Sequence, residues 1–482
     1  MSGMKKYIAI SFVALAAFAV SCKDFLVEEP ILSQSNELTL STYDGLDKAT
    51  AGAYSPLASS TWYGASFVIM NEMHTMNGKK FIGSDFDSGR CNDYYNLNYN
   101  ENNTTGLWGY GYFVISAVNN VMDNLEGKES DNVTVQDLNN LKAECLFLRA
   151  LSHFDLVRTY AQPYCYTADA SHMGVPVVLK TDPSALPARN TVKEVYEQII
   201  ADLKEAESII DPAYVRSATD TKATANIYAI QALLSRVYLY AQQWQNAADY
   251  ATKVINSGKY KMWTAAEVQN GDIYAVDVPT GGEVIFEIYG LKSNSYDGYH
   301  DGISPMTGPG GYGDAGCSAD LIALYDANDV RSTLFQEQSG VTWTAKYKGK
   351  GLGDPDVNNT IVLRLSEMYL NRAEAIANGA SVAGCSVLTD LQTIYYNRVF
   401  DMENAATVGT DMNAVWSERQ KELAWEAHYW FDLGRTKRAS TRTDFVGSPE
   451  AKDVPWPSYK WAMPIPMRET GVNPNLVQNE GY

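Results

Sequence analysis

Two glutamates near the C-terminal end of the chain, Glu422 and Glu426, are the first candidates for chemistry, because paired carboxylates can cleave glycosidic bonds. Such a pair needs one carboxyl group on each side of a sugar ring, roughly 5 to 9 Å apart. Arg419, Glu422 and Glu426 follow one another at spacings of three and four, so they stack along one helix face and cannot flank a ring. With Leu423 and Trp425 between them, they predict a paired and partly buried charge network.

Other signals for catalysis, a cofactor or a metal are weak in this chain. The sequence has no HExxH and no GxSxG motif, and its histidines lack a paired metal spacing. Residues 308–313 fit GxGxxG, but a proline interrupts them and no strand directly precedes them, so we interpret them as the lip of a flexible loop. We therefore predict that the protein is not an enzyme and holds no metal or cofactor. The five histidines are His74, His153, His172, His300 and His428.

The cysteines do not form a recognisable framework. The cysteines after Cys22 are scattered, odd in number and without a CxxC motif. This pattern predicts neither a disulfide framework nor a zinc site, although it leaves room for one bridge. The five are Cys91, Cys145, Cys165, Cys317 and Cys385.

Aromatic side chains are the most unusual part of the composition, with 32 Tyr and 10 Trp against 14 Phe. Tyr and Trp combine an apolar ring with a polar group, which suits ligands that have an apolar face and a rim of hydroxyls, as sugars do. Two clusters combine such rings with carboxylates, amides or a cation, and packing within the fold is the alternative for each ring. The first is Trp62, Tyr63, Asp85, Asp87, Arg90, Asn92, Asp93, Tyr94, Tyr95 and Tyr99; the second is Asn294, Tyr296, Tyr299, His300 and Tyr312.

The N-terminus has the pattern of a secreted, lipid-anchored protein. Lys5 and Lys6 precede an apolar run over 7–20 that is too short to span a bilayer. Ala19 and Ser21 are small residues placed for signal peptidase, and Cys22 follows directly. We predict a signal peptide over 1–21 and acylation of Cys22, which would tether the protein to a membrane. An ordinary signal peptide with an unrelated cysteine is the alternative.

Charge and length limit the remaining function classes. The chain has 482 residues and a formal charge of −19, which becomes −21 once the leader with Lys5 and Lys6 is removed. A strongly acidic chain repels nucleic acid and anionic membrane surfaces, so we expect neither as a partner. No later apolar run is long enough for a membrane span.

Helical hairpins are the elements that must position the candidate residues. Apolar residues recur at helical spacing over 224–240 and 246–255, and Gly258 signals the end of the second helix. Similar pairs are expected between 137–160 and 192–210, and between 361–378 and 386–400. Segments rich in Gly, Asn and Tyr separate them, at about 60–106, 262–317 and 339–360, with a short strand signal over 283–289. Segments of this length often carry function.

Several segments of the chain form an ordered set of motifs. They are 22–26 (CKDFL), 143–150 (AECLFLRA) with 154–158 (FDLVR) and Tyr160, 362–374 (VLRLSEMYLNRAE), 418–426 (ERQKELAWE) with 430–435 (WFDLGR), and the ending with 464–466 (PIP), 473–475 (NPN) and 478–482 (QNEGY). Together they resemble the SusD/RagB family of outer-membrane lipoproteins of the Bacteroidetes. Cys145 and Leu146 replace the usual Ala-Arg of the family's first helix motif, and Ala161 replaces a Gly after it.

This resemblance implies a mainly α fold of irregular, tetratricopeptide-like helical hairpins, with a loop-rich subregion that carries short strands. After the signal peptide, 22–482 would form a single domain with loop-rich glycan-binding insertions at about 60–106 and 262–360. It implies a protein on the outer membrane, facing the cell exterior, that captures oligosaccharides and delivers them to a SusC-like TonB-dependent transporter. A lipid-anchored glycosidase and a peptide-capturing relative are the alternatives. Trp108 lies beside a helix that resembles the family, so we predict that it packs in the core.

Overall fold

Helices form most of the structure, a computed structural model that describes residues 39–216, 221–270, 272–274, 282–290, 302–349 and 358–482. They are α3 (Tyr43–Gly52), α4 (Ser66–Met73), α5 (Asn92–Asn96), α6 (Leu107–Asp123), α7 (Val135–Tyr160), α8 (Val192–Ile209), α9 (Ile227–Tyr240), α10 (Trp244–Asn256), α11 (Ala265–Asn270), α12 (Ile303–Met306), α13 (Ala319–Ile322), α14 (Leu365–Ala377), α15 (Val387–Tyr396), α16 (Met412–Leu423), α17 (Tyr429–Arg435), α18 (Pro449–Lys452) and α19 (Met467–Thr470). Short 3₁₀ turns lie at Ser55–Ala58, Asp272–Tyr274, Val330–Leu334, Met402–Asn404 and Tyr459–Trp461.

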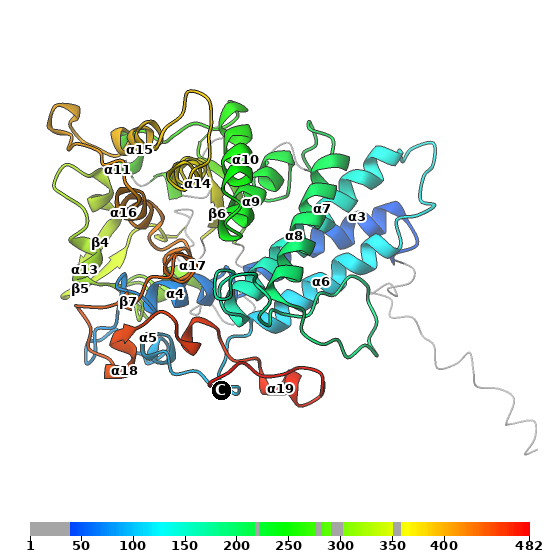
Figure 1. The fold of residues 1–482 in the computed structure, drawn as a ribbon, viewed down its shortest axis with the longest axis horizontal. Coiled ribbons are helices and arrows are strands. Elements are labelled where there is room, and N and C mark those ends of the chain that lie inside the picture. Colours follow the sequence, from blue (N-terminus) through cyan, green and yellow to red (C-terminus); the bar gives the residue numbers. More distant parts are fainter. Residues whose placement is uncertain (1–38, 217–220, 271, 275–281, 291–301, 350–357) are drawn as a thin grey trace, which may run out of the picture.

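The predicted helix pairs are present. Helix α7 packs on α8, α9 on α10, and α14 on α15, while α14 also packs on α10 and so joins the last two pairs (Figure 1). Sequence signals set their ends: capping boxes at Thr134 and Thr191 start α7 and α8, and Gly258 adopts a φ of 63° just after α10. The mainly α fold of helical hairpins is thus confirmed.

One helix starts later than predicted. Residues 361–364 were expected at the start of a helix, but Thr360–Arg364 forms strand β6, and α14 begins at Leu365. The β-branched residues Thr360, Ile361 and Val362 favour an extended backbone, and pairing with β2 (Val284–Ile288) gives that backbone its partner.

The strands that the structure describes form four separate two-stranded antiparallel ladders. Strand β2, predicted over 283–289, pairs with β6. The other pairs are β1 (Gly78–Lys79) with β3 (Gly316–Cys317), β4 (Phe335–Gln338) with β5 (Val341–Thr344), and β7 (Ser440–Thr441) with β8 (Asp453–Val454). The β1–β3 ladder joins the two segments in which the aromatic clusters were predicted.

The segment 60–106 is less loop-like than predicted. It contains α4, whose side chains from Phe67 to Met73 are all buried, and the short helix α5. Trp108 at the start of α6 is also buried, and its ring meets Tyr160 edge-on at 5.1 Å, which confirms its predicted packing role. The core therefore extends into a region that composition alone marks as surface.

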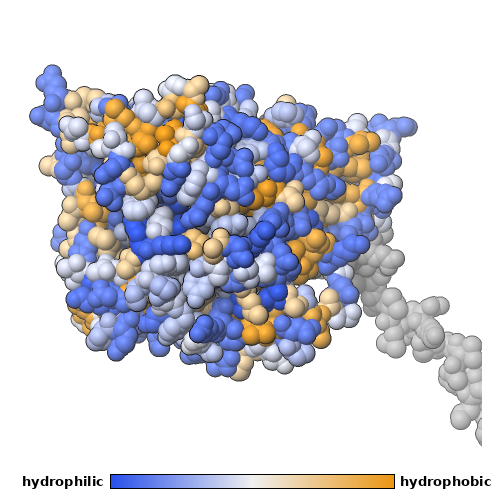
Figure 2. All heavy atoms as spheres, viewed as in Figure 1, coloured by the Kyte–Doolittle hydropathy of each residue, from blue (hydrophilic) through white to orange (hydrophobic). Residues whose placement is uncertain are grey.

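The face of the molecule drawn in Figure 2 is mainly polar. Hydrophilic residues cover most of it, and hydrophobic residues form separate groups. Within the described ranges, each helix is too short or too polar to cross a bilayer.

Candidate functional site

The two predicted clusters meet at Arg90 and Tyr312. The guanidinium carbon of Arg90 lies over the Tyr312 ring, 3.6 Å from its centroid, and Arg90 Nη2 donates a hydrogen bond of 3.0 Å to Tyr312 Oη. Arg90 is exposed and Tyr312 is half-buried. The pair therefore places a cationic group and an aromatic ring side by side, the two kinds of group that suit the hydroxyl rim and the apolar face of a sugar ring.

A buried ion cluster fixes the loop that carries Arg90. Lys80 is 1% exposed and forms ion pairs with Asp87 at 2.7 Å and with Asp314 at 3.6 Å. Asp314 in turn accepts hydrogen bonds from the backbone N–H groups of Ser88 and Cys91, the residues near Arg90. The hydrogen bond from Lys80 lowers the pKa of Asp87, so this carboxylate stays ionised. The cluster ties the two loops together below the Arg90–Tyr312 pair.

An aromatic floor supports the Tyr312 loop. Phe86 meets Trp343 edge-on at 4.7 Å, and Trp343 Nε1 donates a 2.7 Å hydrogen bond to the carbonyl of Gly313. Gly313 has a φ of 58°, and a Cβ atom there would lie 2.8 Å from Phe86 Cδ1. Glycine at this position thus lets the loop bend and approach Phe86 closely.

Five other residues of the first predicted cluster lie within a few positions of Arg90 in the chain and are not fully buried: Asp85, Asp87, Asn92, Asp93 and Tyr94. Asp85 and Asn92 are exposed, and the other three are half-buried. The Lys80 ammonium group also contacts Asn92, so Asn92 belongs to the same polar cluster. Together with Arg90 and Tyr312 they form what we call the loop site: Asp85, Asp87, Arg90, Asn92, Asp93, Tyr94 and Tyr312.

Four predicted rings are buried, and their prediction as ligand contacts is corrected. Trp62, Tyr63 and Tyr95 are at most 3% exposed and Tyr99 is 9% exposed. The polar atoms of two of these rings form hydrogen bonds within the protein. Trp62 Nε1 donates to Asp155 at 2.8 Å, and Tyr99 Oη lies 2.7 Å from His74 Nε2. Their sequence neighbourhood is polar, but α4 and the C-terminal segments cover the rings.

Other predicted residues cannot be placed. Asn294, Tyr296, Tyr299 and His300 lie outside the described residues, as does Cys22. Sequence reasoning in turn missed Lys80, Phe86, Asp314 and Trp343, which hold the loop site in place. Phe86 lies between two aspartates of the predicted cluster and Lys80 lies just before it, whereas Asp314 and Trp343 are remote in sequence and join it only in the fold.

The predicted carboxylate pair is a structural ion network. Glu422 is 2% exposed and contacts Arg364 at 2.5 Å, Arg398 at 2.8 Å and Arg331 at 2.9 Å. Burial alone would raise the pKa of Glu422, but these guanidinium groups lower it well below its ordinary value. Neither a proton donor nor access to a sugar is available there. The predicted charge network is confirmed at Glu422, and it is more deeply buried than expected. The prediction that Arg419, Glu422 and Glu426 stack along one helix face is wrong, because α16 ends at Leu423 and Arg419 pairs with Asp432 instead.

Glu426 belongs to the same network. It pairs with Arg364 at 2.7 Å and with Lys346 at 2.5 Å, and it is 7% exposed. Burial acts to raise its pKa, while Arg364 and Lys346 lower it below the ordinary range. Within the described ranges, no group of three or more His, Cys, Asp or Glu side chains is arranged to hold a metal ion. The cysteines after Cys22 are free thiols.

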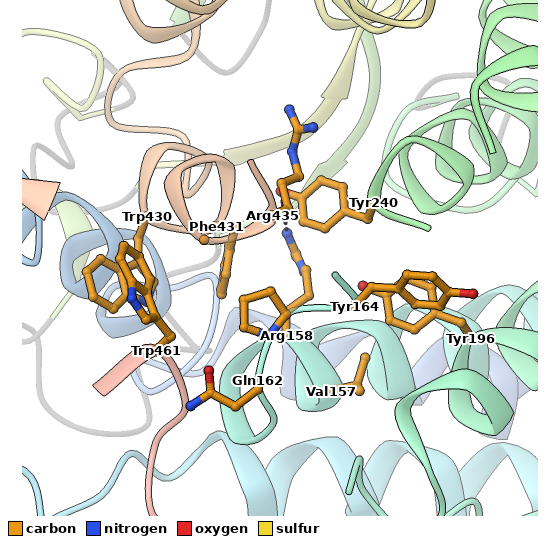
Figure 3. Close-up of a pocket in the computed structure, with 12 residues that line it drawn as sticks. Val157, Arg158, Gln162, Tyr164, Tyr196, Tyr240, Trp430, Phe431, Arg435 and Trp461 are labelled. Carbon is orange, nitrogen blue, oxygen red and sulfur yellow. Dashed lines mark hydrogen bonds between the residues drawn. The ribbon is translucent and has the colours of Figure 1, made fainter. Parts of the chain in front are cut away.

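A second concave region lies where the end of α7 meets the C-terminal segment. Its smaller part is a cavity of about 20 Å³ with aromatic walls, including Trp430 stacked on Trp461 at 4.0 Å (Figure 3). Arg158 Nε and Gln162 Oε1 line this region and are buried without a hydrogen-bond partner in the described part of the chain. The Gln162 oxygen points into the cavity, which has room for about one water molecule.

The larger part is a cavity of about 540 Å³, which we call the tail cavity. Gln162 lines both cavities. The walls of the tail cavity come from the segment after α7, from Arg189, from the turn at 457–459 and from the tail at 478–481. It shares no residue with the loop site, and sequence reasoning did not identify it, because its walls come from segments about 300 positions apart.

Sequence comparison finds two matching families. Residues 24–239 match the family described as starch-binding and associating with the outer membrane, and residues 353–482 match the family described as SusD. SusD-like protein P2 of Formosa agariphila is 27% identical over 99% of this chain and 100% of its own length.

Solved structures have the same fold. A SusD superfamily protein of Bacteroides thetaiotaomicron superposes with a TM-score of 0.80 at 29% identity, covering 91% of this chain and 99% of that one. A surface glycan-binding protein A of the same species, solved in complex with laminarihexaose, superposes with a TM-score of 0.73 at 19% identity, over 91% of this chain and 99% of that one. The second likeness concerns the fold alone.

Proposed function

The chain belongs to the SusD family, which is associated with the outer membrane, and on that basis we propose that it captures oligosaccharides at the cell surface for uptake. The observation that carries the proposal is the Arg90–Tyr312 pair at the loop site. A cation and a ring held together at the surface provide both hydrogen bonding and stacking. Their positions are fixed in advance by Lys80 and Asp314, which reduces the entropy lost on binding.

We propose the full loop site as the glycan contact surface. Asp85, Asp87, Asn92 and Asp93, close to Arg90 in the chain, add hydrogen-bond acceptors and an amide, and Tyr94 adds a half-buried ring. Asn294, Tyr296, Tyr299 and His300 remain part of the proposal from the sequence. A mainly polar surface site with few rings would bind weakly and select its ligand by hydroxyl positions.

Membership of this family also supports a lipid anchor and a transporter partner. We propose that the leader 1–21 is removed, that residues 22–482 form one mature domain, and that acylated Cys22 holds it on the outer membrane, facing the exterior. Its partner would be a SusC-like TonB-dependent transporter, with the helical side of the domain against the transporter and the loop site toward the glycan. The family-level association with the outer membrane supports this arrangement.

Binding without bond cleavage is the form of activity that we propose. The alternatives of a surface glycosidase and of a peptide-capturing protein make different predictions. A glycan array probed with the purified protein tests the proposal, followed by incubation of each hit with the protein and chromatography of the products. Binding without products supports capture. Cleavage products would support a glycosidase, and binding to peptides with none to glycans would support the peptide-capturing alternative.

A further inference from the structure

Arg189 lines the tail cavity, and one of its N–H donors has no acceptor among the described residues. Its Nε donates to Gly174 O at 2.7 Å, Nη1 to Val477 O at 3.0 Å, and Nη2 to the carbonyls of Met173 and Tyr160 at 3.2 and 3.4 Å. A guanidinium has five N–H donors. In the described part of the chain, one N–H of Nη1 therefore has no acceptor.

The charge of Arg189 is also not neutralised. Arg189 is half-buried. Two arginines that are buried pair with acids, Arg149 with Asp202 at 2.7 Å and Arg372 with Asp390 at 2.6 Å. Among the described residues, no carboxylate lies within ion-pair distance of Arg189, and burial lowers its pKa to about 10. Arg442 is similar, but it packs over the Phe445 ring at 4.0 Å and lines none of the cavities described above. Arg189 is thus a cation beside an open cavity.

The rest of the tail cavity suits a sugar ring. Tyr166 and Tyr459 are 41% and 44% exposed, and each is held by an aromatic neighbour, His172 at 5.2 Å and Tyr482 at 5.2 Å. The Oδ1 atom of Asn479 accepts no hydrogen bond from the described residues, while its Nδ2 is fixed by the carbonyls of Tyr160 and Met463. A volume of 540 Å³ lies within the usual range for small-ligand sites.

We propose that the tail cavity is a second saccharide site, and that it takes a sugar residue carrying a carboxylate or sulfate group, with that group beside Arg189. The free N–H of Nη1 provides a charge-assisted hydrogen bond, and the exposed rings of Tyr166 and Tyr459 contact the sugar. The inference extends the proposed glycan-binding role to an acidic ligand class and rests on that role.

Two carboxylates near the site and the overall charge of the chain act against an anion, and each effect is limited. Asp169 interacts with the lining residue His172 but is exposed, so water screens it. Glu480 lines the cavity but is exposed, so water screens it. The net charge of −19 repels anions at a distance, but salt at about 0.15 M screens such repulsion beyond about 8 Å. His172 adds no positive charge near neutral pH, because burial lowers its pKa. At contact distance, the positive charge of Arg189 therefore acts on a bound anion more strongly than these screened negative charges do.

Calorimetry with trigalacturonate and with its fully methyl-esterified form tests the inference. The two probes share their rings and differ in charge. We expect the acid to bind at least roughly tenfold more tightly than the ester, the factor that one charge-assisted hydrogen bond provides. Equal affinity for the two forms, or no binding of the acid, would overturn the proposal.

Variants locate the site. Tyr459→Ala should weaken binding of the acid by roughly fivefold or more, whereas Tyr396→Ala, a 38% exposed tyrosine on α15, should leave it unchanged. Glu480→Gln should strengthen binding of the acid and leave the ester unaffected. Arg189→Lys, which keeps the charge but loses the fork of hydrogen bonds, should weaken it, with a thermal melt to confirm folding.

Failure of this inference is distinguishable from failure of the proposed function. The variant Arg90→Ala with Tyr312→Ala should lose binding to the array glycan and keep binding to trigalacturonate. If that variant loses trigalacturonate while Tyr459→Ala retains it, the acid binds at the loop site and the tail cavity is not a saccharide site. If the protein binds an array glycan but not trigalacturonate, the tail-cavity proposal is wrong and the proposed capture function stands.

Discussion

Arg90 lies over the ring of Tyr312 at 3.6 Å, although 222 positions separate the two residues in the chain. One residue belongs to the segment before α5 and the other to the segment after α12. The β1–β3 ladder, in which Gly78 pairs with Cys317, and the Lys80–Asp314 ion pair bring these segments together. The contact is therefore a product of the scaffold.

Replacing both partners tests their role in binding. Arg90→Ala with Tyr312→Ala should weaken binding to the best array glycan by roughly thirtyfold, because each stacking or charged contact contributes on the order of 1 kcal/mol. The melting temperature should change little, since Arg90 is exposed and Tyr312 only half-buried. Calorimetry and thermal melts measure the two effects. Full binding by the double variant would show that the glycan contacts other residues.

Tyr95 and Trp108 provide the matched controls. Tyr95 is fully buried against Phe445 at 4.6 Å, and Trp108 is 3% exposed. Tyr95→Ala and Trp108→Ala should each lower the free energy of unfolding by about 3 to 5 kcal/mol, because truncating a buried ring leaves a large cavity. Denaturant titration measures this loss. If Tyr95→Ala stays stable but loses glycan binding, Tyr95 contacts the glycan after all.

The lipid anchor gives a third prediction. Cys22→Ala should release the protein from the membrane fraction, because one residue would carry all the acyl chains. Fractionation should be performed in cells that lack the transporter partner, since that partner could retain the protein by itself. Sedimentation of this variant with the outer membrane in such cells would contradict acylation at Cys22.

The buried ion network predicts a stability effect without a functional one. Glu422→Gln should lower the free energy of unfolding by about 3 to 5 kcal/mol, because it leaves Arg364, Arg398 and Arg331 without their shared carboxylate. Denaturant titration measures the loss. If the wild type cleaves a glycan and the folded variant does not, Glu422 is catalytic and the capture function is wrong.

Glu72 predicts a distinctive pH dependence. It is fully buried on α4, and burial raises the pKa of its carboxyl from 4.5 to about 7, although a 2.7 Å hydrogen bond from Asn77 opposes the shift. Between these two pH values the folded protein holds a proton that the unfolded chain has released. This residue's contribution to stability must therefore fall as pH rises from about 4.5 to about 7, and then level off.

The variant Glu72→Gln should remove that fall. A shift of this size corresponds to roughly 3 kcal/mol, so the variant should be more stable than the wild type by up to that amount at pH 8 and about equal to it at pH 4.5. Denaturant titrations across this pH range measure the difference. Parallel stability curves for the two proteins would show that Glu72 does not titrate in this window.

The sequence alone was sufficient to predict features that depend on residues close together in the chain. Helical periodicity located α9 and α10, and Gly258 marked a helix end. Each of these depends on residues within a few positions of one another, so the chain's own order contains the information. The charge network at Glu422 is different, because its partners Arg364, Arg398 and Arg331 are distant in the chain and meet it only in the fold. The start of α14 was missed because β6 exists only through its pairing with β2, a distant strand.

The binding surface was decided by the tertiary structure. Tyr95 and Arg90 lie five positions apart in equally polar surroundings, yet Phe445 covers Tyr95, while Arg90 stays exposed. Composition cannot tell which ring will be covered, because the covering residue lies about 350 positions away. Arg189 and Tyr459 likewise line one cavity only because the C-terminal tail folds back over the end of α7. Long-range packing, which no local pattern encodes, selects the residues left open for a ligand.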